Sequence, residues 1–274
     1  MGRPVTTSEE VRDLFNVTAN AKHKYDTWST GHRRADVVPH VLAHTTRVLY
    51  TLTRDDLERV RCPSGEDEHA LGRVKRAQAE SVADIVDWEP DFAFTHVFHH
   101  ALETLGHLPT WQEFRRFCEN DPVARRALWL PAQAKIAEVQ DSHGTTSAVA
   151  HDAMRWRVGN AYYSSVREIH LITLLRIHGI DVRFHPLADA LFRVDAWWGH
   201  TVLSIYVGND RFRNAGRGRK EPPERILHGA APSFAFETIN LAPADRYGVV
   251  HLAAEKDIQA VAERLKANPG PEPP

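Results

Sequence analysis

The stretch ALFRVDAWWGHTVLSIYV, residues 190–207, contains two runs of strand-forming residues separated by Gly199 and His200. Valine, isoleucine, tryptophan and tyrosine favour strands, and a short connection containing glycine between two such runs is typical of a β-hairpin. We therefore expect two neighbouring strands, over residues 190–198 and 200–207.

Side-chain alternation along these strands places polar residues where a core would be expected. Successive side chains of a strand point to opposite faces, so one face of the second strand is apolar and belongs in a core: Leu203, Ile205 and Val207. The other face carries Ser204 and Tyr206. Asp195 lies in the first strand, directly before an alanine and two tryptophans. Because an unpaired buried carboxylate is costly, Asp195 should bind a metal, a cation or a hydrogen-bond network.

The segment before the hairpin reads as a long helix that carries a second carboxylate. Residues 152–180, DAMRWRVGNAYYSSVREIHLITLLRIHGI, have helical character that stops at Gly179. Glu168 lies three residues before Leu171 and seven before Leu175, which belong to the apolar stripe. Glu168 should therefore lie on or beside the buried face of the helix.

The remaining elements surround this helix and hairpin with further strands and a last helix. Strand-like runs are DVRFHPL (181–187), SFAFETINL (233–241) and YGVVHLA (247–253), followed by a helical EKDIQAVAERLKA (255–267) and a disordered tail, 268–274. The resulting order, α-β-β-β-loop-β-β-α, indicates a mixed sheet flanked by helices. We expect an α+β domain over residues 149–267.

Residues 1–148 read instead as a helical N-terminal module. Helical patterns cover residues 8–20, 37–52 and 92–106, with a polar break at 62–72. Thr110 and Glu113 have the spacing of a capping box, and a short helix should follow Asp121. These last two helices fit either a packing pair, the commoner arrangement, or a helix-turn-helix that touches DNA.

Composition narrows the class of protein. The 274 residues carry a net charge of −2 and no run of about 20 apolar residues, so no membrane span is expected. The N-terminal residues lack the apolar core of a secretory signal, which predicts a cytoplasmic protein. Cys62 and Cys118 are expected to be free thiols.

The largest local charge asymmetry is the segment RFRNAGRGRK, residues 211–220. It holds five cations and no carboxylate: Arg211, Arg213, Arg217, Arg219 and Lys220. The segment fits either a solvated loop or a loop that contacts phosphates, and its place after the candidate strand favours phosphate contact. Arg155, Trp156 and Arg157 could add stacking and phosphate contacts. Trp197 and Trp198 fit the same role, although such a pair more often packs in a core.

A helix with Glu168, a strand with Asp195 and a hairpin to a strand with polar Ser204 and Tyr206 resemble the PD-(D/E)XK nuclease superfamily. The resemblance covers roughly residues 150–267 and implies a restriction-endonuclease-like sheet. It further implies that Glu168 and Asp195 bind Mg²⁺, and that the protein acts on nucleic acid, with DNA expected. The contexts of such folds include restriction, phage defence and mobile elements.

The third motif departs from the superfamily pattern, which leaves two hypotheses open. Ser204 and Tyr206 stand where the resemblance implies an acid and a lysine. Lys220, Arg217 or Arg219 could supply the missing charge, and Glu237 is a less favoured replacement acid. The protein is then either a Mg²⁺-dependent phosphodiester hydrolase or a non-cleaving nucleic-acid-binding or assembly subunit. In the second case the helical module would dock protein partners.

A zinc site on the helix at residues 92–106 is the remaining alternative. His96 and His100 share one helical face, with Glu103 close by, and His107 or Cys118 could add a ligand. Because no CxxC or HExxH signature is present, packing of these histidines beside aromatic residues is the favoured interpretation. The sequence also lacks a Gly-rich phosphate loop and a nucleophile elbow.

Overall fold

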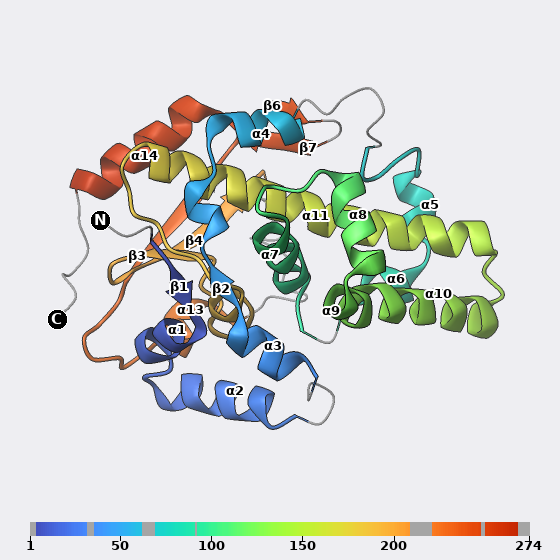
Figure 1. Ribbon diagram of the computed structural model, residues 1–274, viewed down its shortest axis with the longest axis horizontal. Helices are drawn as coiled ribbons and strands as arrows, with labels where there is room; N and C mark the ends of the chain where they lie inside the picture. The colour runs from blue at the N-terminus through green and yellow to red at the C-terminus, as the bar shows by residue number, and fades with distance from the viewer. Residues whose placement is uncertain are drawn as a thin grey trace. The chain divides into compact units, whose positions relative to one another are not determined.

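A computed structural model describes residues 4–31, 36–61, 69–90, 92–208, 221–247 and 250–267 (Figure 1). The chain forms two compact units. Residues 1–55 and 167–274 make up the first unit, and residues 56–166 make up the second. Among the described residues, none of the helices is both long and apolar enough to cross a bilayer.

The second unit is built from helices. They are α4 (Arg54–Arg61, which begins in the first unit), α5 (Arg76–Glu80), α6 (Ala83–Val86), α7 (Phe94–Leu105), α8 (Trp111–Asn120), α9 (Pro122–Ala124), the π-helix η3 (Arg125–Trp129), α10 (Leu130–His143) and the N-terminal part of α11 (Ser147–Ile177).

Local signals set the ends of these helices. Helix α7 ends at Gly106, whose φ of 77° lies in the left-handed region that glycine adopts at low cost. The Thr110 hydroxyl accepts from the Glu113 amide, and the Glu113 carboxylate accepts from the Thr110 amide at 2.8 Å. The Asp121 carboxylate accepts from two amides of α9. The capped helix and the short helix after Asp121 are therefore confirmed.

Aromatic side chains form one part of the core of the second unit, beside an aliphatic cluster around Ile85 and Ile136. Tyr162 of α11 has a ring centroid 5.7 Å from Phe98, 5.4 Å from Trp111 and 5.8 Å from Phe114. Its hydroxyl donates to the Pro109 carbonyl at 3.0 Å, which satisfies the one polar atom of the buried ring. Helix α8 thus packs against the core, as expected of a packing pair.

A loop at residues 69–74 lies close against α11 at a glycine. A Cβ atom added at Gly159 would lie 2.8 Å from Leu71 Cδ2 and 3.0 Å from the Ala70 carbonyl oxygen. Tyr163, on the same helix as Gly159, accepts a hydrogen bond from the Ala70 amide through its hydroxyl group at 3.3 Å. Glycine is required at position 159 because only a missing side chain lets the loop backbone approach the helix.

The first unit begins with small elements around a two-stranded sheet. These are β1 (Thr6–Thr7), α1 (Ser8–Phe15), α2 (Ala19–Ser29), α3 (Val37–Ala43), β2 (Thr45–Thr46) and the 3₁₀ helix η2 (Val48–Thr51). The prediction of one helix over 37–52 is wrong, because β2 interrupts it to pair antiparallel with β1. Residues 16–18 likewise separate α1 from α2 within the helix predicted over 8–20.

A three-stranded mixed sheet positions the candidate site. It contains β3 (Ala196–Trp198), β4 (Thr201–Val207) and β5 (Ala235–Leu241), in the order β3-β4-β5. Strand β3 pairs antiparallel with β4 through Gly199, and β5 pairs parallel with β4. The hairpin is confirmed, but its first strand is shorter than predicted, because residues 188–192 form the π-helix η4 (Ala188–Phe192).

A single antiparallel bridge extends the sheet beyond β3. Arg183 and Trp197 exchange both backbone hydrogen bonds, at 2.6 and 2.9 Å. The strand predicted over 181–187 is therefore reduced to one bridged residue. The Tyr50 hydroxyl donates to the Phe184 carbonyl at 2.9 Å and accepts from the Phe184 amide at 3.0 Å, which fixes the segment next to the bridge.

The first unit ends with a second antiparallel hairpin and a helix. Helix α13 (Pro223–Ile226) lies between β4 and β5 in the chain, and β6 (Pro243–Tyr247), β7 (Val250–Ala253) and α14 (Glu255–Ala267) follow. The protein is thus mostly helical and α+β, with an N-terminal helical region followed by a small mixed sheet, as the sequence predicts at this coarser level.

The division into compact units differs from the boundary suggested by the change in sequence character. Helix α11 begins at Ser147 and continues through residues 148 and 149. In the sequence, the boundary between the two units falls within this helix, between Val166 and Arg167. The domains predicted over 1–148 and 149–267 stay a prediction. The tail at 268–274 lies outside the described residues.

Replacing Gly159 with alanine tests the close approach of the loop to α11. The added methyl group should lower the free energy of unfolding by about 1–2 kcal/mol, because overpacking outweighs the gain in helix propensity of about 1 kcal/mol. Urea denaturation measures this change. Ser164→Ala, at an exposed position of the same helix, is the control and should change it by at most about 0.5 kcal/mol. A Gly159→Ala protein as stable as the wild type would contradict the prediction.

Candidate functional site

Glu168 lies on α11 beside fully buried residues of the first unit. Ile169 and Leu171 have no exposed surface, and Glu168 itself is half-buried. Its Oε1 atom is covered and has no hydrogen-bond partner among the residues that the structure describes. The prediction that Glu168 lies on or beside the buried face of this helix is confirmed. A covered carboxyl oxygen without a donor is unusual enough to require an explanation.

Asp195 lies directly before β3 and binds the backbone of the neighbouring strand. Its Oδ2 accepts a hydrogen bond from the Ile205 amide at 2.7 Å. The antiparallel register of β3 and β4 ends at the pair Ala196↔Leu203, so the Ile205 amide lies beyond the last paired residue of β3. The Asp195 side chain thus takes the place of a strand carbonyl, in agreement with the hydrogen-bond network expected for it.

A third carboxylate, Asp189 on η4, belongs to the same cluster. Burial raises the pKa of Glu168 well above its usual value of 4.5, and the negative charges of Asp189 and Asp195 raise this pKa further. The charge of Asp195 thus acts on Glu168, the other acid singled out in the sequence, and Asp189 is a third acid that sequence reasoning did not identify. The sequence signal that marks Asp189 is an acid within the apolar run LADALF, residues 187–192.

Arg193 makes the turn between η4 and Asp195. It is the only non-glycine residue with positive φ in the described part of the chain, at 60°. The left-handed region costs a residue with a Cβ atom free energy, and such strain is often found at functional sites. The turn redirects the chain from the π-helix with Asp189 to the strand that follows Asp195.

Ser204 and Tyr206 follow Asp195 on the polar face of β4. Continuing the register by one residue places Ser204 opposite Asp195, and residues opposite each other in a sheet share a face. Both Ser204 and Tyr206 are half-buried, and β5 pairs them with Thr238 and Asn240. This face is polar, as the alternation predicts.

The opposite face of β4 is less uniformly apolar than predicted. Leu203 is fully buried and Val207 is 8% exposed, which confirms their place in the core. Ile205 is only half-buried, whereas Val202 on the polar face is 1% exposed. The first half of β4 is thus buried on both faces, and its second half is partly open.

The replacement acid considered on β5 already has an ionic partner. The Glu237 carboxylate accepts from Arg264 Nη2 at 2.6 Å and from Arg264 Nε at 3.0 Å. This two-pronged pair joins β5 to α14. A role for Glu237 as a replacement acid stays a prediction beside this structural contact.

The two arginines singled out on α11 have intramolecular partners. Arg155 donates to the carbonyls of Ala70 and His69, at 3.1 and 2.9 Å. Arg157 donates to the Trp88 carbonyl at 2.8 Å and lies over the Phe94 ring. A role for Arg155 and Arg157 in binding nucleic acid stays a prediction beside these structural contacts.

Trp197 packs in the core of the first unit. It is 6% exposed, and its ring meets that of Phe15 edge to face at 5.2 Å. For Trp197 this agrees with core packing, the commoner of the two roles considered for the tryptophan pair. The basic segment with Arg211, Arg213, Arg217, Arg219 and Lys220 lies outside the described residues.

Two of the histidines considered as zinc ligands, His100 and His107, lie within hydrogen-bond distance of carboxylates. His100 Nε2 lies 3.0 Å from Asp121 Oδ1, and His107 Nε2 lies 3.3 Å from Glu113 Oε1. Cys118 is buried and forms no disulfide within the described part of the chain, from which Cys62 is absent, and burial raises the pKa of the Cys118 thiol. Within the described ranges, no group of three or more His, Cys, Asp or Glu side chains has the arrangement of a metal site.

Comparison of the chain with protein-family models, with curated proteins and with solved structures finds no match.

The raised pKa of Glu168 predicts how stability depends on pH. The folded protein retains a proton on Glu168 that the unfolded chain releases above about pH 4.5, so stability should fall as pH rises from there towards the folded pKa. Glu168→Gln removes this titration. Its free energy of unfolding, measured by urea denaturation, should fall less between about pH 5 and about pH 8 than that of the wild type.

Glu263→Gln, an exposed substitution on α14, is the matched control and should keep the wild-type pH dependence. Parallel pH profiles for the wild type and Glu168→Gln would show that the Glu168 carboxyl is ionised in the folded protein, against the prediction.

Proposed function

We propose that the chain is a DNA-acting protein of the PD-(D/E)XK type, in which Glu168 and Asp195 form a divalent-cation site. The observation that carries this proposal is the electrostatic interaction between these two acids: the negative charge of Asp195 raises the pKa of Glu168, although the two lie 27 residues apart in the sequence. Perturbed carboxylates clustered on one surface are a frequent mark of functional sites.

The order and direction of the strands support the restriction-endonuclease-like interpretation. Helix α11 carries Glu168, the bridged Arg183 precedes β3, and β3 and β4 form an antiparallel hairpin. Strand β5 then returns parallel to β4 after a connection that contains α13. A helix with Glu168, a strand that follows Asp195 and a hairpin to β4 are the elements on which the resemblance rests, and they support the proposal.

The carboxylates present are suitable ligands for Mg²⁺. Magnesium prefers oxygen ligands, and proteins usually hold it through one or two carboxylates together with waters and substrate phosphates. Glu168 and Asp195 would supply these carboxylates, and Asp189 would add negative charge beside them. When bound, Mg²⁺ supplies charge stabilisation at the phosphoryl group and a more acidic water. A site completed by substrate phosphate does not require a preformed cage of three protein ligands.

The remaining residues of the proposed site act on water and on the nucleic-acid backbone. Ser204 and Tyr206 lie on the polar face beside Asp195 and would orient water or substrate through their hydroxyl groups. The cations of residues 211–220, Lys220 among them, would contact phosphates, because positive charge next to glycine can approach a backbone closely. Restriction, phage defence and mobile elements are the contexts we propose, and the cytoplasm is the compartment.

Cleavage of plasmid and linear DNA in Mg²⁺ or Mn²⁺ tests the enzymatic form of the proposal. Asp195→Asn keeps an oxygen that can accept from the Ile205 amide but removes the charge. We expect this variant to fold with near-normal thermal stability and to cleave about a hundredfold more slowly, since metal ions lower such barriers by several kcal/mol. Gel analysis of the DNA products measures the rate.

The control for this experiment is Glu263→Gln on α14, which should cleave at the wild-type rate. Cleavage that persists unchanged in both Asp195→Asn and Glu168→Gln would assign the activity elsewhere and reject the proposed catalytic site.

Binding without cleavage is the second candidate function, and the identity of the third motif favours it. Ser204 and Tyr206 offer neither the acid nor the fixed positive charge of an active nuclease. In this form the fold serves as a nucleic-acid-binding or assembly subunit, and the N-terminal helices dock protein partners.

Salt dependence of DNA binding tests this second form. Neutralising Arg217, Arg219 and Lys220 together with glutamine should make the slope of log K against log salt shallower by about 2–3, because each phosphate contact contributes about 0.9. Fluorescence anisotropy with a labelled duplex measures the slope. The double variant Lys256→Gln, Lys266→Gln on α14 removes exposed cations elsewhere and should leave the slope unchanged. If the triple variant has the wild-type slope, the segment does not contact phosphates.

A further inference from the structure

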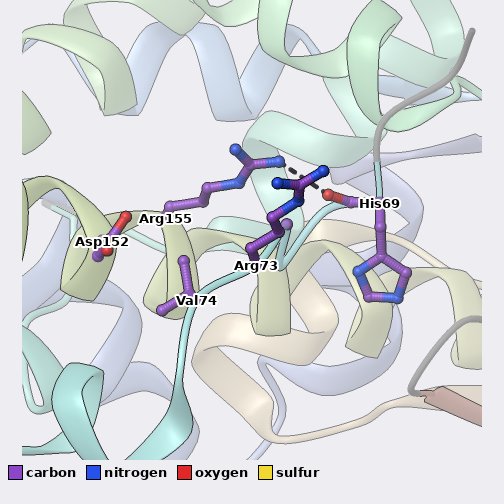
Figure 2. Close-up of a pocket in the computed structure, with 6 residues that line it drawn as sticks. His69, Arg73, Val74, Asp152 and Arg155 are labelled. Atoms are coloured by element: carbon purple, nitrogen blue, oxygen red, sulfur yellow. Dashed lines mark hydrogen bonds between the residues drawn. The ribbon is translucent and has the colours of Figure 1, made fainter.

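The second unit contains a polar cavity that the proposed function does not use. It has a volume of about 580 Å³ and lies between the loop at residues 69–74 and helix α11 (Figure 2). The loop contributes His69, Gly72, Arg73 and Val74 to its lining, and the helix contributes Asp152 and Arg155. A cavity of this size accommodates a small metabolite.

Arg155 is fixed in the wall of this cavity by the loop backbone. Its guanidinium donates to the Ala70 and His69 carbonyls, at 3.1 and 2.9 Å. A Cβ atom added at Gly72 would lie 2.5 Å from Arg155 Cζ, so the guanidinium lies directly against the glycine backbone. Gly72 also has a φ of 57°, a conformation that favours glycine. Glycine at this position therefore both allows the turn and leaves room for the guanidinium. A guanidinium held in this way loses little conformational entropy when it binds a ligand.

The charge of the cavity is positive at one end. Arg73, an exposed side chain of the loop, lines the same cavity as Arg155. The positive charge of Arg155 also acts on His69: burial lowers the pKa of the imidazole, and the Arg155 charge lowers it further. Two guanidinium groups in one cavity repel each other, and an anion between them would relieve this repulsion through charge-assisted hydrogen bonds.

Asp152 gives the cavity a second, acidic end. It lies one helical turn before Arg155 on α11, and Figure 2 shows its carboxylate apart from the two guanidinium groups. The His69 ring is also directed away from them. A ligand that fits both ends must carry an anionic group at one end and hydrogen-bond donors at the other.

We propose that this cavity binds a small phosphorylated compound with hydroxyl groups, such as a sugar phosphate. Arg73 and Arg155 hold the phosphate, because planar guanidinium groups match phosphate oxygens in geometry and charge. Asp152 accepts hydrogen bonds from the hydroxyl groups. The site belongs to the second unit alone and does not depend on Glu168 and Asp195.

Isothermal titration calorimetry on the full chain, with inorganic phosphate, ribose 5-phosphate and ribose as probes, tests the proposal. The wild type should bind ribose 5-phosphate more tightly than phosphate, and ribose most weakly. Arg73→Gln should weaken the binding of inorganic phosphate and of ribose 5-phosphate about tenfold or more, since a hydrogen bond to a charged group is lost. Arg116→Gln, an exposed substitution on α8 outside the cavity, is the matched control and should bind all three probes as the wild type does.

Asp152→Ala separates the proposed site from a general attraction of anions. Removing this carboxylate should strengthen binding of inorganic phosphate, because a negative charge is lost, and weaken binding of ribose 5-phosphate, because the hydroxyl acceptor is lost. Opposite signs for the two probes support the proposal. The proposal is wrong if the wild type binds neither inorganic phosphate nor ribose 5-phosphate, or if Arg73→Gln binds both as tightly as the wild type does. It is also wrong if Asp152→Ala changes the affinity for both compounds in the same direction.

Discussion

The cluster of three carboxylates at the edge of the small sheet is the constraint on which the first unit depends. Burial raises the pKa of the Glu168 carboxyl, and the charges of Asp189 and Asp195 raise it further, so the folded chain favours the protonated carboxyl more than water does. Asp195, one of the charges that act on Glu168, also stabilises the hairpin, because its carboxylate accepts a hydrogen bond from the Ile205 amide of β4. A fold that tolerates such repulsion offers a reason to expect a ligand there, because functional sites are where proteins retain locally unfavourable groups.

Features set by neighbouring residues could be predicted from the sequence. Gly106 ends its helix in the left-handed conformation, Thr110 and Glu113 cap the next one, and the turn at Gly199 joins two antiparallel strands. Each of these signals spans only a few positions, so the physical cause lies within the sequence window that contains it. Glu168 and Asp195 could be selected for the same reason, as acids in otherwise apolar helical and strand patterns.

Features set by distant partners could not be predicted in this way. Thr45 and Thr46 leave a helical pattern because Thr6 and Thr7 lie beside them as a strand, some forty residues earlier in the chain. Asp189 joins the acidic cluster because residues 188–192 form a π-helix where the composition favoured a strand. In both cases tertiary packing outweighs local propensity, and the sequence window contains only the propensity.

The net charge of −2 is a sum over regions of opposite charge, an acidic one in the first unit and a basic one in the second. In the first unit, the negative charges of Asp189 and Asp195 act on Glu168, whose Oε1 atom is covered. In the second unit, Arg155 lies against the Gly72 backbone and shares a cavity with Arg73. Binding at a site depends on the field at that site and not on the sum of charges over the chain. A near-zero total therefore excludes neither a cation at the acidic cluster nor an anion at the basic cavity, and each can be tested without the other.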